Sequence, residues 1–376
     1  MKIIMNKAGN GDCFLVKTNF SNLLIDGGTS SSYKHWSKSL SNINVIDALF
    51  ITHIDSDHTN GVIKLLDEKV NKTIHISNVF FNGVKEITQM EVGLDCDYDT
   101  EYDAITSNFS QVHNTDMNIG FSEGTSLSYM LELKGVLINQ TNKSKAIHQE
   151  SFNNPLKIND VTIQILGPKL KSLNKLKSLW LDVLEERGIR RKVITSKHSK
   201  SFETFVNSLS QTQNEDSNIS SNNTLCIDEL CAQQYVRDTS LSNETSLSFI
   251  IRNNDKSILM LGDSHVETII EWMDSQQIKI LHIDAIKISH HGSKHNINAD
   301  FIKRVMCNKY LISTNGKKHH HPDLEALAII SKYSSKPITN IYLNYKIEKI
   351  PTTFIKNLGN LPNPAFIHFG NEEITI

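Results

Sequence analysis

Four potential metal ligands lie within six residues, His53-Ile54-Asp55-Ser56-Asp57-His58, and this segment restricts the fold more than any other. It follows the apolar run Ala48–Thr52, which predicts a buried strand, and precedes apolar residues at helical spacing from Val62 to Leu66. The helix is expected to begin near its N-cap candidates, Thr59 and Asn60. The order strand, polar loop, helix places the ligands at the carboxyl end of a strand, where open α/β sheets carry their sites.

Imidazole nitrogens and carboxylate oxygens are ligands of divalent metals. Four such side chains in one tight loop can face two sides of a pocket, with one pair holding each of two metals. Two metals about 3.5–4 Å apart are the arrangement used for hydrolysing phosphate esters and amides. The alternative is a solvated acidic turn whose histidines are incidental, and the strand-loop-helix context favours the metal loop over it.

Further polar side chains end other predicted strands. Asp263 follows the strand Ser257–Leu261, although an aspartate there can also be a helix N-cap. His290 and His291 follow the strand Ala285–Ser289, where a lone histidine would usually be a core residue. In the histidine run before Pro322, His321 is the one that the following helix would fix in position.

Residues 169–200 differ in composition from their surroundings. They contain ten Lys or Arg against three acids, and their leucines recur at helical spacing. Arg190, Arg191 and Lys192 could neutralise the phosphates of a DNA or RNA backbone, whereas the alternative is a solvated helix face. Residues Ser208–Asn223, which are rich in Ser, Asn and Gln, predict a mobile loop.

The remaining pattern predicts one α/β domain over residues 1–376 with an insertion at about 169–240, because strands and helices alternate on both sides of it. Apart from those already named, the expected elements are strands at Ile3–Met5, Cys13–Lys17, Leu23–Ile25, Thr73–Phe81, Ser126–Ile138, Val161–Leu166 and Ser246–Arg252, a helix at Val266–Ser275 and edge strands in the last 35 residues.

Composition excludes several classes of protein. The formal net charge of −2 gives no global basic field, and the five scattered cysteines lack a CxxC pair, which argues against a disulfide framework and a structural zinc site. No apolar run is long enough for a signal peptide or a membrane-spanning helix. We therefore expect a soluble cytoplasmic protein without membrane contact; the sequence carries no signal for its oligomeric state.

Taken in order, the motifs resemble the metallo-β-lactamase superfamily. Within it they look most similar to the nuclease-type domain of the competence protein ComEC and its stand-alone relatives. The resemblance covers about 1–168 and 240–376. It rests on Gly9-Asn10-Gly11-Asp12-Cys13, Leu24-Ile25-Asp26-Gly27-Gly28, Thr52–His58, Asn243–Ser248, Leu261-Gly262-Asp263, His290-His291-Gly292-Ser293 and His321-Pro322.

The resemblance implies a four-layer αβ/βα sandwich with a largely helical insertion and two divalent ions, zinc or manganese, at one edge. It implies the following residue roles: His53 and Asp55 hold one metal; Asp57, His58 and His290 hold the other; Asp263 bridges them; Asp26 and Asn243 support the ligands from behind. The superfamily's third-motif histidine would fall near Asn243 and is missing, which predicts a weaker first site. Asp55, where the wider superfamily has histidine, makes that site more hospitable to manganese.

The same resemblance implies a metal-dependent hydrolase, specifically a phosphodiesterase or nuclease that cleaves DNA or RNA by attack of a metal-bridging hydroxide. In this hypothesis Asp57 orients the nucleophile, and His291 or His321 donates a hydrogen bond or a proton. Two alternatives stay open. One is a hydrolase of a small substrate, such as a cyclic nucleotide, phosphodiester or lactone, with the insertion as a lid. The other is an effector subunit that depends on a protein partner.

Overall fold

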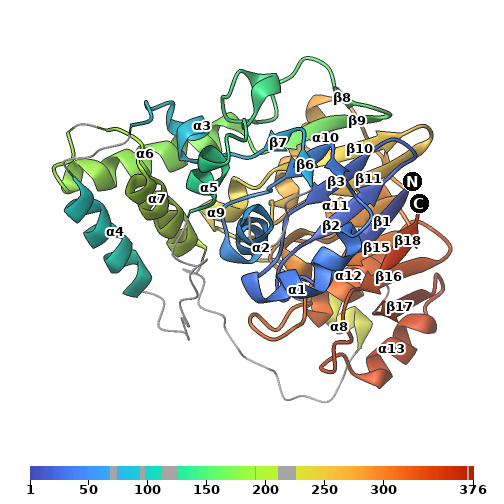
Figure 1. Cartoon of the computed structure of the whole chain (residues 1–376). Coiled ribbons are helices and arrows are strands. Elements are labelled where there is room, and N and C mark those ends of the chain that lie inside the picture. The colour runs from blue at the N-terminus through green and yellow to red at the C-terminus, as the bar shows by residue number, and fades with distance from the viewer. Residues whose placement is uncertain (68–73, 94–97, 112–125, 191, 211–225, 371) are drawn as a thin grey trace.

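The computed structural model describes residues 1–67, 74–93, 98–111, 126–190, 192–210, 226–370 and 372–376 (Figure 1). Its centre is a pair of mixed sheets. The first has the strand order β18-β1-β2-β3-β5-β7 and the second the order β17-β16-β15-β13-β11-β10-β9-β8. The strands of the first sheet are β1 (Lys2–Met5), β2 (Phe14–Lys17), β3 (Asn22–Ile25), β5 (Ala48–Phe50), β7 (Val79–Phe80) and β18 (Glu373–Thr375). Those of the second are β8 (Leu156–Ile158), β9 (Val161–Gly167), β10 (Ser248–Asn253), β11 (Lys256–Met260), β13 (Ala285–Lys287), β15 (Lys309–Ile312), β16 (Thr339–Leu343) and β17 (Ala365–Phe369).

The two sheets share one apolar core, in which Phe50 of the first sheet stacks on Phe249 of the second, with ring centroids 4.4 Å apart. Because alternate side chains of each strand point to opposite faces, the outer faces need their own cover. The first sheet is covered by α1 (Tyr33–Trp36), α2 (Ser56–Leu66) and α5 (Leu127–Leu133), and the second by α10 (Val266–Ser275), α11 (Ala299–Arg304), α12 (Leu324–Tyr333) and α13 (Thr352–Gly359). The order of layers is therefore helix, sheet, sheet, helix, and the predicted α/β fold is confirmed.

Helices between residues 84 and 244 gather beside the first sheet (Figure 1). They include α3 (Val84–Thr88), α4 (Asp99–Gln111), α6 (Leu170–Glu186), α7 (Ser196–Leu209) and α9 (Leu241–Glu244), while α8 (Ile227–Ala232) packs on α12. Trp180 of α6 donates its indole N–H to Nε2 of His198 on α7, at 3.0 Å, which ties the two helices together. Both helices belong to the same apolar core as α1 and α2, so they pack directly against the helices that cover the first sheet.

The smaller elements are two short parallel pairs and several 3-10 turns. The pairs are β4 (Val45–Ile46) with β6 (His75–Ile76) and β12 (Leu281–His282) with β14 (Val305–Met306). The turns lie at Ser30–Ser32, Ser37–Leu40, Gln140–Asn142 and Ser289–Gly292. No helix in the described part of the chain is both long and apolar enough to span a membrane.

Three expectations about elements were wrong. The segment predicted as a strand at Ser126–Ile138 begins with α5, because Ser126 caps the helix by accepting from Tyr129 N and the buried Leu127 and Leu131 are four residues apart. Helix α2 begins at Ser56 rather than after Asn60, so half of the metal loop forms its first turn. The last 35 residues contain the helix α13 between strands. The loop predicted over Ser208–Asn223 lies mostly outside the described residues.

Candidate metal centre

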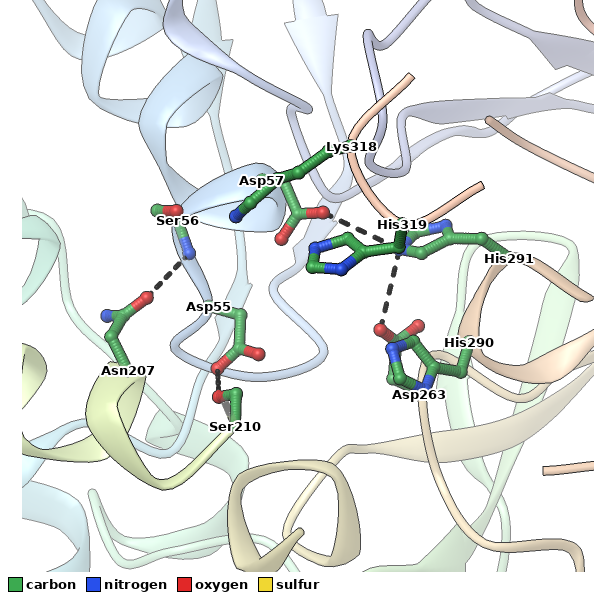
Figure 2. A pocket seen from close by; sticks show the side chains of 10 residues that line it. All are labelled: Asp55, Ser56, Asp57, Asn207, Ser210, Asp263, His290, His291, Lys318 and His319. Atoms are coloured by element: carbon green, nitrogen blue, oxygen red, sulfur yellow. Dashed lines mark hydrogen bonds and ion pairs between the residues drawn. The ribbon is translucent and has the colours of Figure 1, made fainter. Parts of the chain in front are cut away.

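The two sheets bring their polar loops together at one edge of the sandwich. β3 and β5 run parallel in the first sheet, and β11, β13 and β15 run parallel in the second, so that the carboxyl ends of each set coincide. The metal loop follows β5, Asp263 follows β11 and His291 follows β13. Figure 2 shows these side chains facing one pocket from the two sheets.

Asp263 lies at the centre of this arrangement. Its Oδ2 is 3.7 Å from Nε2 of His53, 3.4 Å from Nε2 of His58 and 3.5 Å from Nε2 of His291. Nε2 of His53 and of His58 are buried and lack a hydrogen-bond partner. Buried polar atoms are normally paired, so these unpartnered nitrogens around one carboxylate fit a metal-binding site that includes Asp263.

A four-residue potential metal-binding cluster is present among the described residues: one ligand atom from each of Asp12, His58, Asp263 and His291 lies within 4.8 Å of the others. Asp12 was not among the predicted ligands. Its Oδ1 lies 3.3 Å from Nδ1 of His291, and its Oδ2 forms an ion pair with the ammonium group of Lys287. Two features of the sequence could have indicated this pair: Asp12 lies in the glycine-rich turn before β2, and Lys287 lies inside an apolar strand.

His291, and not His290, reaches the centre, which differs from the ligand set expected from the sequence. Both residues adopt left-handed backbone conformations, with φ of 44° for His290 and 55° for His291. Such conformations cost about 1–3 kcal/mol each in ordinary residues and are held by the surrounding structure. Here the His290 N–H donates to Gly262 O at 3.2 Å, and His291 Nδ1 lies 2.9 Å from Ser313 O. The turn directs Nε2 of His291 toward Asp263 and leaves Nδ1 of His290 3.0 Å from Asn296 Oδ1.

Asp26 supports the centre from behind. It is fully buried and accepts hydrogen bonds from the backbone N–H of Thr52, at 2.7 Å, and from its hydroxyl, at 2.8 Å. Its Oδ2 is 2.9 Å from Nδ1 of His58. This contact orients the ring of His58, so that its Nε2 is turned toward Asp263.

Asp57 and Asp55 are held by different neighbours. Asp57 Oδ2 accepts from the Asn10 amide at 2.7 Å and lies 3.6 Å from Nε2 of His291. Position 11 must be glycine, because a β-carbon there would collide with the backbone carbonyl of Asp57. Asp55 Oδ2 is 3.5 Å from Nε2 of His53, while its Oδ1 accepts from two serine hydroxyls, Ser242 at 2.5 Å and Ser210 at 2.9 Å.

The pocket above these residues encloses about 410 Å³, including its open mouth. Its lining residues are Asp55, Ser56, Asp57, Asn207, Ser210, Asp263, His290, His291, Lys318 and His319. Asn207 and Ser210 come from the insertion, at the end of α7, and Asn207 Oδ1 accepts from the N–H of Ser56 at 2.9 Å.

Other predicted site residues do not line this pocket. Arg190 and Lys192 belong to the loop after α6 and are absent from the lining, and Arg191 lies outside the described residues. The His321 ring lies 5.3 Å from the ring of His290, and its Nδ1 is 3.4 Å from Asp323 Oδ2. The residue of the histidine run that does line the pocket is His319.

In the metal-free centre, close pairing of histidines with carboxylates decides which side chains are charged. Burial disfavours the charged form of His291, but Asp263 and Asp12 outweigh it and raise its pKa to about 10. For His58, the carboxylates of Asp263 and Asp26 likewise outweigh burial and hold the pKa well above its usual value. Burial would raise the pKa of Asp57, yet His291 and His58 bring it well below the ordinary range. The metal-free protein therefore carries imidazolium rings where a metal needs neutral nitrogens.

Metal binding is consequently expected to release protons from His58 and His291. The folded-state pKa of both rings is raised, so both are protonated at pH 7 and a metal has to replace these protons. Without a metal, the His291 ring keeps its proton until the pH approaches about 10. Titrating manganese into the protein in buffers of different ionisation enthalpy should show about two protons released at pH 7, with affinity rising from pH 6 to 8. An affinity independent of pH would contradict these pairings.

The same pairing sets the stability of the metal-free protein. A histidine whose pKa is higher in the folded state than in the unfolded state stabilises the fold at pH values below its unfolded-state pKa. This contribution is lost as the pH rises through the folded-state pKa. The free energy of unfolding of the metal-free form should therefore fall between about pH 6.5 and 10.

Residues in the N-terminal part of this chain match a known family. The family model of the metallo-beta-lactamase superfamily matches residues 6–109. A similar solved structure is the metallo-beta-lactamase fold protein YhfI from Bacillus subtilis, with 10% sequence identity and a TM-score of 0.36 over 91% of this chain and 95% of that one. The short form of human tRNase Z has 11% identity and a TM-score of 0.33 over 84% of this chain and 93% of that one. A diphosphatase of the PhnP family has 10% identity and a TM-score of 0.34 over 100% of this chain and 97% of that one. No curated protein gave a match. The matched residues include Asp12 and the whole of the His53–His58 loop, and over them the chain is similar to the metallo-beta-lactamase superfamily.

Proposed function

We propose that this chain is a metal-dependent phosphodiesterase that acts on DNA or RNA. The superfamily match and the metal-binding cluster support the broader class, a metal-dependent hydrolase. The observation that carries the proposal is the convergence of three imidazole nitrogens on Oδ2 of Asp263, at 3.4–3.7 Å. Two divalent ions, when bound there, would activate water and neutralise charge on phosphoryl oxygens.

The protein's own residues would prepare the pocket for this chemistry. His58, His291 and Asp57 would hold one ion, His53 and Asp55 the other, and Asp263 would bridge them. Asp26 fixes the ring of His58, and Ser313 O fixes that of His291, so that neither ring has to reorient during turnover. Such preorganised groups contribute most when the substrate reaches them without solvent rearrangement.

An anionic substrate also needs a cation at the mouth of the pocket. Lys318 is exposed, lines the pocket and lies on the side of Asp57 in Figure 2. Burial raises the pKa of Asp57, and the groups that lower it are His291, His58 and, to a smaller extent, the ammonium group of Lys318. We propose that it contacts a non-bridging oxygen of the phosphodiester.

Changing Lys318 to Ala should raise KM for an oligonucleotide about tenfold and change kcat less, because an exposed charge contributes mainly to substrate binding. The effect should shrink in high salt, since the contact is screened. Steady-state kinetics at two salt concentrations would measure it. The neighbouring Lys317, exposed but not in the pocket lining, is the matched control, and an equal effect of both changes would contradict a specific contact.

A second candidate is a hydrolase of a small phosphodiester or cyclic nucleotide. The specific observation that favours it is that Asn207 and Ser210, at the end of α7, form part of the pocket wall beside the metal loop. A pocket walled by several segments suits a small ligand.

Two measurements test the proposal. Metal content after purification should be near two equivalents. Cleavage of plasmid DNA, RNA and bis-(p-nitrophenyl) phosphate should then be compared with manganese and with zinc. Cleavage of the polymers supports the nuclease, turnover of small esters alone supports the second candidate, and failure to retain or bind any metal overturns both.

A further inference from the structure

One buried oxygen beside the metal loop has no function in the site described so far. Asn243 lies in α9 and is only 1% exposed. Its amide oxygen Oδ1 is buried and has no hydrogen-bond partner, although Asn243 donates through its amide nitrogen. A buried carbonyl oxygen without a donor is unfavourable, and a bound cation is one way to satisfy it.

The orientation of this amide is fixed by a carboxylate. Nδ2 of Asn243 lies 2.7 Å from Oδ2 of Asp238, which is itself 1% exposed and accepts a second hydrogen bond from Asn296 Nδ2 at 2.9 Å. The opposite amide orientation would set two acceptors face to face. Oδ1 of Asn243 is therefore held away from Asp238.

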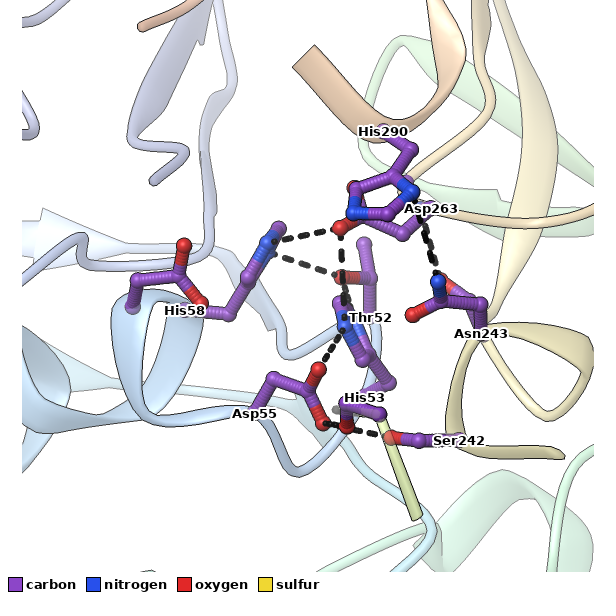
Figure 3. Close-up of polar contacts among 12 residues, drawn as sticks. Thr52, His53, Asp55, His58, Ser242, Asn243, Asp263 and His290 are labelled. Carbon is purple, nitrogen blue, oxygen red and sulfur yellow. Dashed lines mark hydrogen bonds and ion pairs between the residues drawn. The ribbon is translucent and has the colours of Figure 1, made fainter. Parts of the chain in front are cut away.

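The same segment is attached to the metal loop on both sides of Asn243. Ser242 donates to Asp55 Oδ1 at 2.5 Å, and the backbone N–H of Leu247 donates to Thr52 O at 2.7 Å. Figure 3 shows the amide nitrogen of Asn243 toward His290 and its oxygen toward His53. The unpartnered oxygen thus faces the side of the site where Nε2 of His53 is also unpartnered.

We infer that Oδ1 of Asn243 is a direct ligand of the first metal, together with His53, Asp55 and the bridging Asp263. The inference rests on the proposed function and replaces the supporting role that the sequence assigned to Asn243. Asp238 becomes the residue that positions this ligand, as Asp26 does for His58.

The inferred ligand makes the two sites chemically different. The first would have one nitrogen and three oxygen donors, whereas the second, with His58, His291, Asp57 and Asp263, would have two of each. Oxygen ligands suit manganese and magnesium, and imidazole suits zinc. The first site should therefore prefer manganese more strongly than the second site does. In this inference the asparagine replaces the missing histidine as a ligand and exchanges a nitrogen donor for an oxygen donor.

The test is calorimetric titration and elemental analysis of the full chain with manganese and with zinc. The wild-type protein should bind two ions. Asn243→Ala should weaken one manganese site at least about tenfold while the other keeps its affinity, and Asn243→His should raise the zinc-over-manganese preference of that site. Asn253→Ala is the matched control, because Asn253 is a similarly buried asparagine that donates to Asp160 instead.

Asp238→Asn tests the same ligand without removing it, and is the variant of choice if Asn243→Ala does not fold. Loss of the fixed acceptor lets the Asn243 amide turn, so one manganese site should weaken about 10–100-fold. Two ions bound with unchanged manganese affinity in these variants would overturn the inference and leave the proposed function standing. A wild-type protein that binds no metal would overturn the proposed function itself.

Discussion

Replacing Asp263 with asparagine should lower hydrolysis of bis-(p-nitrophenyl) phosphate by about three orders of magnitude or more. Removal of a single stabilising group from an active site typically costs about 10²–10³-fold, and Asp263 is expected to serve both metals at once. Asparagine keeps the size of the side chain and can still accept from Lys287 through its oxygen, but its amide nitrogen would face His53, His58 and His291.

The readouts are kcat, bound metal and the unfolding temperature. We expect kcat and metal content to fall together while the fold persists. Asp274→Asn is a suitable control, since Asp274 lies on the neighbouring helix α10, is 61% exposed and pairs only with Arg304 among the described residues. An Asp263→Asn protein that retains more than about a tenth of the activity would refute the central place given to this carboxylate.

Changing Lys287 to Met should destabilise the metal-free protein by about 3–5 kcal/mol, which is the usual cost of removing one partner of a buried ion pair. Lys287 is fully buried in β13 and contacts Asp12 as well as Asp263, with 3.3 Å to Oδ1 of the latter. Although burial alone would lower the pKa of its ammonium group, these two carboxylates raise it. Without the lysine, two buried carboxylates lose one of the positive charges that compensate them.

Urea unfolding in the presence of a chelator would measure this loss, and adding manganese should reduce it because the ions supply positive charge to the same carboxylates. Lys256→Met is the control: Lys256 is 39% exposed and its ion pairs with Asp255 and Asp284 lie at the surface, so the expected change is below about 1 kcal/mol. A change of similar size in both variants would contradict the role assigned to burial at Lys287.

Local patterns made much of the framework predictable. The apolar runs that become β1, β3, β9 and β10 end at turn residues, and α10 has the bounds that its spacing predicts. The predictions failed where tertiary contacts decide. The α5 segment has apolar residues that suit a strand or a helix, and its helix depends on the Ser126 cap and on Glu203 of α7, which accepts from Leu127 N and Ser128 N at 2.8 and 2.9 Å.

The candidate centre was predictable by residue type more than by geometry. The loop His53–His58 and the partners at later strand ends follow from motif order, whereas the choice between His290 and His291 depends on two left-handed residues that no spacing rule reveals. Asp12 and Lys287 were missed for a related reason. Their importance comes from mutual burial across two sheets, between residues 275 positions apart in the sequence, and a single sequence does not show such a pairing.

The end of α7 makes this helix difficult to treat as a removable part of the chain. Asn207 accepts from the backbone N–H of Ser56, and Ser210 donates to Asp55, so a chain shortened in this region would lose groups that hold the metal loop. Conversely, a molecule that displaced the end of α7 would also move Ser56 and Asp55 through these two hydrogen bonds. Binding on the helical layer, outside the pocket, would in this way change the geometry of the metal loop.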